Sequence, residues 1–174
     1  MKTALVYSTH FGYTREAAST LKEALKGPVA VISFDSLNPP KIEKYDTVIL
    51  GSSIRMGVID PDFRSWLDKH RLELAEKRIA IFLACGFPEE FDSYIQNNFP
   101  AEIIDSAIST VSIGGKLDGE MKWFDRQLVK LMKKQIAKTN GAPIVPMLSN
   151  LDDLVWALEH TEQKSPSTDV GPSE

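Results

Sequence analysis

The chain has 174 residues, of which 43% are hydrophobic and 25% are charged, and its net charge is −4. This length and composition predict one soluble domain with its own core, and no apolar run approaches the roughly 20 residues of a membrane span. The single cysteine, Cys85, excludes an intramolecular disulfide and fits a reducing compartment, and the negative charge argues against nucleic acid as the main partner.

Apolar, β-prone runs alternate with helical patterns along the chain. The predicted strands lie within residues 3–7, 28–34, 44–52, 77–86 and 107–115. The predicted helices lie within residues 13–27, 60–77, 88–99, 118–138 and 151–161, and the polar tail 162–174 is predicted to be disordered. The first four strands are almost continuously apolar, as expected of parallel strands covered on both faces. The alternation therefore predicts an α/β fold with helices on both faces of a parallel sheet.

Three turns of this predicted fold are candidates for a functional site. In a parallel α/β sheet, ligands bind beyond the carboxyl ends of the strands. The turns at residues 8–14, 51–60 and 84–90 all follow predicted strands and lie at that edge. We therefore expect these three turns to form one site.

The turn at residues 8–14 has the features of an anion-binding loop. It carries hydroxyl groups and a glycine directly before a helix, where unpaired N–H groups and the helix dipole favour negative charge. Ser8, Thr9 and Thr14 are predicted hydroxyl donors to a phosphate, and Gly12 allows the backbone to approach it. The turn matches neither a P-loop nor a GxGxxG fingerprint. The alternative is that Thr14 only caps the helix.

The second turn, with sequence GSSIRMGVID, contains two serines, an arginine and two glycines. Taken alone, it is typical of an ordinary loop. It becomes informative if the first and third strands are neighbours, as in a sheet of order 2-1-3-4-5, because both turns then flank one crevice.

Two parts of the sequence carry a family resemblance. The segment ALVYSTHFGYTREAASTL resembles the phosphate-binding start of flavodoxin-like proteins, with its T-x-x-G-x-T turn. The segments YDTVILGSSIRMG and KWFDRQLVKLMKK resemble the menaquinone-dependent protoporphyrinogen IX dehydrogenase family, a flavodoxin-like branch in haem biosynthesis. The resemblance covers about residues 1–160. It implies a three-layer flavodoxin-like sandwich of strand order 2-1-3-4-5, with an insertion after or within the fifth strand.

The resemblance also implies FMN as the cofactor and a set of residues to bind it. The phosphate is expected at Ser8, Thr9, His10, Phe11, Gly12, Tyr13 and Thr14. The ring is expected between Ser52, Ser53, Ile54, Arg55, Met56 and Gly57 on one side and Ala84, Cys85, Gly86 and Phe87 on the other. No metal site is expected.

Two of these residues, Arg55 and Cys85, have more than one interpretation. Phe87 is the candidate for stacking on the ring. Arg55 is assigned either to the polar edge of the flavin, to a substrate carboxylate, or to the surface without a role. Cys85 is more typical of a small core residue than of a redox group.

The segment 116–141 is expected to be the insertion, within a flavodoxin-like domain at residues 1–161. Its apolar residues recur at helical spacing. Residues 116–138 hold seven basic and three acidic residues, a local net charge of +4. Such a basic face suits either propionate groups or anionic lipid headgroups, and the alternative is a solvated lysine face. The protein is expected to be cytoplasmic, with peripheral contact at the inner face of the cell membrane if lipid headgroups are what this face binds.

The resemblance implies an FMN-dependent oxidation of protoporphyrinogen IX with a quinone as electron acceptor. Two other functions fit the same sequence. One is a flavodoxin-type carrier that passes single electrons to protein partners, and the other is an NAD(P)H-dependent quinone reductase. The oligomeric state and the residues that take part in catalysis, apart from Arg55 as a candidate substrate contact, are not predicted.

The basic face leads to a test with lipid vesicles. Each Lys or Arg near an anionic surface contributes about 1 kcal/mol, and salt screens it. The protein should sediment with phosphatidylserine vesicles at low ionic strength, and the triple variant Lys130→Glu, Lys133→Glu, Lys134→Glu should not. The absorption spectrum of bound FMN serves as the control for folding. Equal sedimentation of wild type and triple variant would leave these lysines as a solvated face.

Overall fold

The computed structural model describes residues 1–116, 130 and 144–161 and contains a five-stranded parallel sheet of order β2-β1-β3-β4-β5. The strands are β1 (Thr3–Tyr7), β2 (Val29–Ser33), β3 (Thr47–Ser53), β4 (Arg78–Ala84) and β5 (Ala107–Ser112). The predicted α/β fold and the strand order are confirmed.

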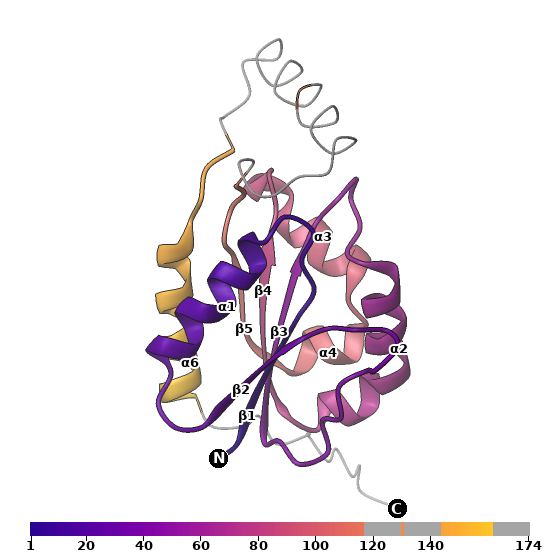
Figure 1. Ribbon diagram of the computed structural model, residues 1–174, viewed down its shortest axis with the longest axis vertical. Helices are drawn as coiled ribbons and strands as arrows, with labels where there is room; N and C mark the ends of the chain where they lie inside the picture. The colour runs from indigo at the N-terminus through magenta and orange to yellow at the C-terminus, as the bar shows by residue number, and fades with distance from the viewer. Residues whose placement is uncertain (117–129, 131–143, 162–174) are drawn as a thin grey trace, which may run out of the picture.

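Helices cover both faces of the sheet. They are α1 (Tyr13–Ala24), α2 (Pro61–Ala75), α3 (Phe91–Asn98), α4 (Ala101–Ser106) and α6 (Leu151–His160), with short 3-10 turns η1 (Pro88–Glu90) and η2 (Leu148–Asn150). Figure 1 shows α1 and α6 on one side of the sheet and α2, α3 and α4 on the other. The result is the three-layer arrangement that the alternating sequence predicts.

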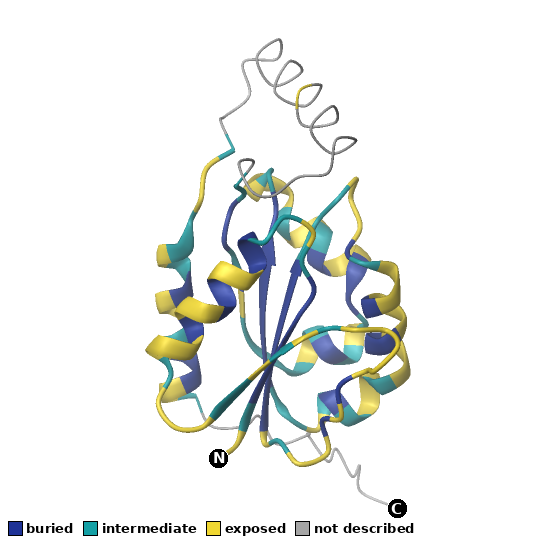
Figure 2. Ribbon diagram, viewed as in Figure 1, coloured by how far each residue is buried: buried dark blue, intermediate teal, exposed yellow. Residues whose placement is uncertain are grey.

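Successive strand residues point to opposite faces and build two cores. On one face, Val48 and Leu50 of β3 pack with Phe63 of α2. On the other face, Ile49 packs with Leu21 of α1 in a second buried cluster. Figure 2 shows the central strands buried and the outer helix surfaces exposed. Both faces of the sheet are therefore covered, which explains why its strands are almost continuously apolar in sequence.

Gly51 near the end of β3 is required by packing. A Cβ at this position would overlap the ring of Phe82, which lies on the neighbouring strand β4 in register with Gly51. The glycine lets this large ring lie flat across the sheet. Strands β3 and β4 are therefore closely packed at the edge of the sheet that carries the expected site.

Helix α4 is a feature that the sequence analysis did not predict. The sequence pattern predicts one helix at residues 88–99 and then a strand from residue 107. Pro100 ends the first helix and, with φ −58° and ψ 143°, precedes a new helix of six residues. A helix this short shows too little periodicity to stand out in a sequence.

The chain leaves the sheet after β5 and returns beside it. Gly114 and Pro146 form an antiparallel bridge, and Met147 N–H donates to the Ile113 carbonyl at 2.8 Å. The insertion therefore follows β5. The predicted helix 118–138 lies outside the described residues except for Lys130, which is exposed, and the tail 162–174 lies outside them altogether. In the described part of the chain, no helix has the length and apolar character needed to cross a membrane.

Candidate functional site

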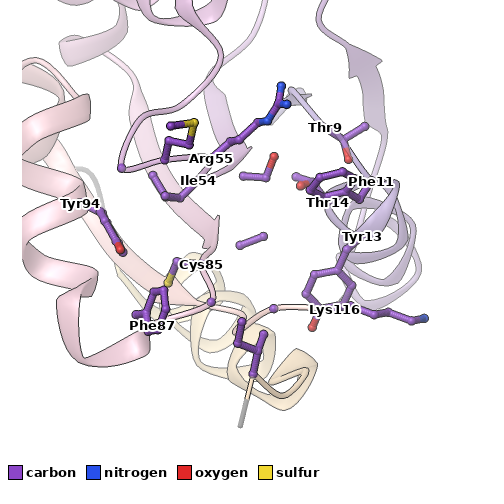
Figure 3. A pocket seen from close by; sticks show the side chains of 17 residues that line it. Thr9, Phe11, Tyr13, Thr14, Ile54, Arg55, Cys85, Phe87, Tyr94 and Lys116 are labelled. Carbon is purple, nitrogen blue, oxygen red and sulfur yellow. The ribbon is translucent and has the colours of Figure 1, made fainter. Parts of the chain in front are cut away.

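The three turns converge at the carboxyl ends of β1, β3 and β4. Ser8 N–H donates to the Gly51 carbonyl at 2.9 Å, and Ile54 N–H donates to the Ala84 carbonyl at 2.8 Å, so each turn is tied to the next strand. Between the turns is a cavity of about 330 Å³. Its lining residues are Thr9, Phe11, Tyr13, Thr14, Ser53, Ile54, Arg55, Met56, Gly57, Ala84, Cys85, Gly86, Phe87, Tyr94, Gly115, Lys116 and Ile144 (Figure 3).

The first turn presents free backbone donors. Gly12 has φ +82°, a left-handed conformation that favours glycine, and its N–H donates to Thr9 Oγ1 at 3.1 Å. The first N–H of α1 to find a helical partner is that of Glu16, which donates to the Gly12 carbonyl at 3.0 Å. Within the described part of the chain, the N–H groups of residues 10, 11, 13 and 14 have no acceptor. This is the donor set of an anion-binding helix N-terminus.

Thr14 is the strongest sign of a ligand. It is fully buried and lines the cavity, and its hydroxyl has no hydrogen-bond partner in the described structure. It does not cap α1, because the N-cap residue is Gly12 and the helix start has no side-chain cap bond. A buried hydroxyl without a partner costs about 1–3 kcal/mol, which a phosphate oxygen in the turn would relieve. The residues present therefore fit a phosphate group.

Tyr13 contributes its ring to the cavity and its hydroxyl to the framework. The hydroxyl donates to the Ile113 carbonyl at 2.7 Å and accepts from Met147 N–H at 3.3 Å. Burial raises the pKa of Tyr13, although the bond from Met147 opposes this. The phenol therefore stays neutral and joins α1 to the two chain segments that flank the insertion.

The second wall of the cavity is a tight turn after β3. Arg55 N–H donates to the Val58 carbonyl at 2.9 Å, and Val58 N–H donates to the Arg55 carbonyl at 3.2 Å. The two residues between them, Met56 and Gly57, have φ of +53° and +84°, which is the pattern of a type I′ turn. Met56 is a non-glycine residue with a positive φ, and it is 83% exposed. The turn presents the Arg55 side chain to the cavity, as Figure 3 shows.

The third wall runs from Ala84 to Phe87 at the end of β4. Cys85 is 1% exposed, and its sulfur lies 3.2 Å from Ser112 Oγ. Burial raises the pKa of the Cys85 thiol, so the thiol stays protonated. A buried, protonated thiol is what we expect if Cys85 is a small core residue. Phe87 lies on the same side of the cavity as Cys85 in Figure 3. The wall therefore offers the ring surface that the stacking prediction needs, and stacking itself stays a prediction.

Tyr94 is a lining residue that the sequence analysis missed. It comes from α3, and its ring lies near Phe87 and Cys85 in Figure 3. Burial and a hydrogen bond with Glu90 raise the pKa of Tyr94 to about 12. The hydroxyl is therefore neutral at physiological pH.

Lys116 also lines the cavity, and its Nζ lies 2.9 Å from Glu16 Oε2.

The structure brings most of the predicted site residues together, but four of them do not line the cavity. Ser8 is 8% exposed and His10 is exposed, and both lie in the first turn. Gly12 has no side chain, and we expect only its backbone to contact the phosphate. Ser52 is fully buried within β3, and its hydroxyl has no partner in the described structure. The flavin contacts of all these residues stay predictions.

Comparisons with known proteins agree with the fold. A family model described as Flavodoxin domain matches residues 4–141. Over 144 residues, the chain is 30% identical to protoporphyrinogen IX dehydrogenase (quinone) of Escherichia coli K12, covering 77% of this chain and 80% of the relative. Among solved structures, a flavoprotein of Lactobacillus acidophilus in complex with FMN has a TM-score of 0.50 at 15% identity, covering 64% of this chain and 92% of that one. This last likeness concerns the fold alone.

The chain belongs to the flavodoxin family. Its cofactor is FMN, and it is a flavoprotein of the oxidoreductase kind. The phosphate-binding features of the first turn and the cavity beside it fit this cofactor. Within the described residues, no group of three or more His, Cys, Asp or Glu side chains is arranged to hold a metal ion.

Removing the Thr14 hydroxyl tests the phosphate site. Thr14→Val keeps the shape of the side chain, and the loss of one charge-assisted hydrogen bond should weaken FMN binding by about 10- to 150-fold. The protein without FMN should be as stable as wild type or more so, because the lost hydroxyl has no partner there. Fluorescence titration of FMN and thermal unfolding of the apoprotein measure the two effects.

The matched control is Thr20→Val on the same helix, where the threonine is exposed and its hydroxyl donates to the Glu16 carbonyl. This control should leave FMN affinity unchanged. If Thr14→Val binds FMN as tightly as the control does, Thr14 has no part in phosphate binding.

Proposed function

We propose that the protein oxidises protoporphyrinogen IX to protoporphyrin IX, with a quinone as electron acceptor. The observation that carries the proposal is the 30% identity with the E. coli dehydrogenase over 144 residues, which covers 77% of this chain and 80% of the relative. The reaction removes six electrons and six protons from the substrate and converts three quinones to quinols. Bound FMN supplies the redox chemistry, accepting electrons from the substrate and giving them to the quinone.

The chain's own residues position the reactants in this proposal. The amides of residues 10, 11, 13 and 14 and the Thr14 hydroxyl hold the cofactor phosphate. The walls at residues 53–57 and 84–87 enclose the ring. Together with Tyr94, they form a largely apolar cavity that suits the flavin ring.

Arg55 gives the proposal a charged anchor for the substrate. Protoporphyrinogen IX carries two propionate groups, and a guanidinium pairs well with carboxylates. In Figure 3 the Arg55 side chain starts beside Ile54 and extends toward the first turn, where Thr9 lies. We assign it to a propionate, which is the second of its three interpretations from the sequence.

The proposed membrane contact is assigned to the basic segment that contains Lys130. The vesicle test described above examines this contact independently of Arg55.

A flavodoxin-type electron carrier is the second candidate, and one observation favours it. Glu89, Glu90 and Asp92 are all exposed beside the third wall of the cavity. An acidic surface at this place suits docking of a basic redox protein. Because the carrier and the dehydrogenase bind FMN at the same site, only turnover separates them.

The turnover experiment uses the purified FMN-loaded protein. Anaerobic protein mixed with protoporphyrinogen IX and a water-soluble menaquinone analogue should produce fluorescent protoporphyrin IX at a rate proportional to enzyme. Parallel reactions contain NADPH in place of the porphyrinogen. Quinone reduction by NADPH without porphyrinogen oxidation would favour a quinone reductase. Electron transfer only to a basic redox protein would favour the carrier.

Arg55→Ala tests the substrate anchor within the same assay. Loss of one ion pair to a propionate should raise the KM for protoporphyrinogen IX by about 10- to 100-fold in protein that is fully loaded with FMN. Arg64→Ala, an exposed position on α2, removes the same charge and should behave as wild type. The dimethyl ester of the substrate lacks the carboxylates, so Arg55→Ala should hardly change its KM. An equal effect on acid and ester would contradict the assignment.

A further inference from the structure

Asn98 connects helix α3 to the turn that forms the second wall of the cavity. Its side chain is 1% exposed and makes three hydrogen bonds. Nδ2 donates to the Gly57 carbonyl at 3.0 Å and to the Tyr94 carbonyl at 2.9 Å, and Oδ1 accepts from Ile59 N–H at 3.0 Å. The bonds to Gly57 and Ile59 span about 40 residues of sequence, so they fix tertiary structure. Figure 1 shows α3 beside the chain that follows β3.

These bonds immobilise one particular peptide unit, the one between Gly57 and Val58. Its carbonyl accepts from Asn98 Nδ2, and its N–H donates to the Arg55 carbonyl at 3.2 Å. Gly57 has no side chain to hinder rotation, and its φ of +84° is one that glycine adopts freely. The peptide is therefore held by hydrogen bonds at both ends and not by steric restraint. Turning it over requires both bonds to break.

The orientation of this peptide matters because Gly57 lines the cavity. The N5 atom of an oxidised flavin accepts hydrogen bonds, whereas after uptake of one electron and one proton it carries an N–H that donates them. A wall peptide that turns its carbonyl toward the ring would stabilise that one-electron-reduced form. The Gly57 carbonyl is already engaged by Asn98.

We propose that Asn98 is a positioning residue that locks the Gly57–Val58 peptide and thereby disfavours accumulation of one-electron-reduced FMN. The lock suits an enzyme that handles electrons in pairs and is unsuited to a single-electron carrier. This inference rests on the placement of the flavin ring in the cavity that is part of the proposed function. Sequence patterns give no sign of it, because Asn98 is one of two adjacent asparagines in a helical segment.

The neighbouring asparagine supplies a matched control. Asn97 lies on the same helix, is exposed, and bonds only to Ser93 Oγ at 3.2 Å within the described structure. Asn98→Ala should raise the hydrogen-exchange rate of the Ile59 amide in the apoprotein by about tenfold, and Asn97→Ala should leave it unchanged. In wild type, the Ile59 amide should be protected. Exchange of this amide in wild type at the rate of an exposed loop would overturn the lock, whether or not any variant folds.

The redox consequence is measured separately, by anaerobic reduction of the FMN-loaded proteins with dithionite. Wild type and Asn97→Ala should pass to fully reduced flavin with little one-electron-reduced species in the visible spectrum. Asn98→Ala should accumulate severalfold more of it. Asn98→Asp, which keeps the acceptor for Ile59 N–H but loses both donor bonds, should do the same. Equal amounts in all variants that fold would overturn the redox role.

The outcomes also distinguish this proposal from the proposed function. If porphyrinogen is not oxidised but Asn98→Ala accumulates one-electron-reduced FMN, the lock stands and the substrate assignment fails. If porphyrinogen is oxidised but abundant one-electron-reduced FMN appears in wild type, the redox role of Asn98 is overturned and the substrate assignment stands.

Discussion

The pairing of β1 with β3 is the constraint on which the site depends. Because β1 and β3 are adjacent and parallel, with Tyr7 opposite Gly51, the turns that follow them leave the sheet side by side. The pairing of β3 with β4 then adds the third turn, with Ser53 opposite Ala84. A sheet in which β1, β3 and β4 were not neighbours would separate the helix N-terminus from the two walls of the cavity. The buried apolar strands therefore stabilise the fold and also set the distances between polar groups that are far apart in sequence.

The site is built with polar groups that the protein alone does not satisfy. Folding normally pairs buried donors and acceptors, yet the Thr14 hydroxyl and the amides at the start of α1 stay without partners in the described structure. Their desolvation cost is offset when an anion occupies the turn, so binding of FMN should add to the stability of the folded state. The opposite holds at the second wall, where Asn98 satisfies the Gly57 carbonyl and the Ile59 N–H in advance. The first turn is thus left with free donors for a ligand, whereas hydrogen bonds to Asn98 already fix the backbone of the second wall.

The sequence alone was enough to predict the features that depend on local pattern. Apolar runs and helical spacing indicated all five strands and the main helices, and the hydroxyl-rich turn before α1 led to the prediction of a phosphate site. It did not indicate α4, whose six residues carry little periodicity, or Tyr94, which lines the cavity from helix α3. Asn98 was equally hidden, because its role depends on a contact with residues 57–59 that only tertiary structure creates. Local sequence patterns can predict where a turn will lie, but they cannot predict which distant side chain will form hydrogen bonds with it.

The central claim is that the helix N-terminus beside β1 binds the phosphate of FMN. The most direct measurement is the dissociation constant of the apoprotein for FMN and for riboflavin, which has the same ring system and no phosphate, obtained under one set of conditions by fluorescence quenching. With the Thr14 hydroxyl and several amides as charge-assisted donors, FMN should bind at least about 100-fold more tightly than riboflavin. Thr14→Val should narrow this ratio by weakening FMN binding alone. Equal affinities of the wild-type protein for FMN and riboflavin would contradict the account.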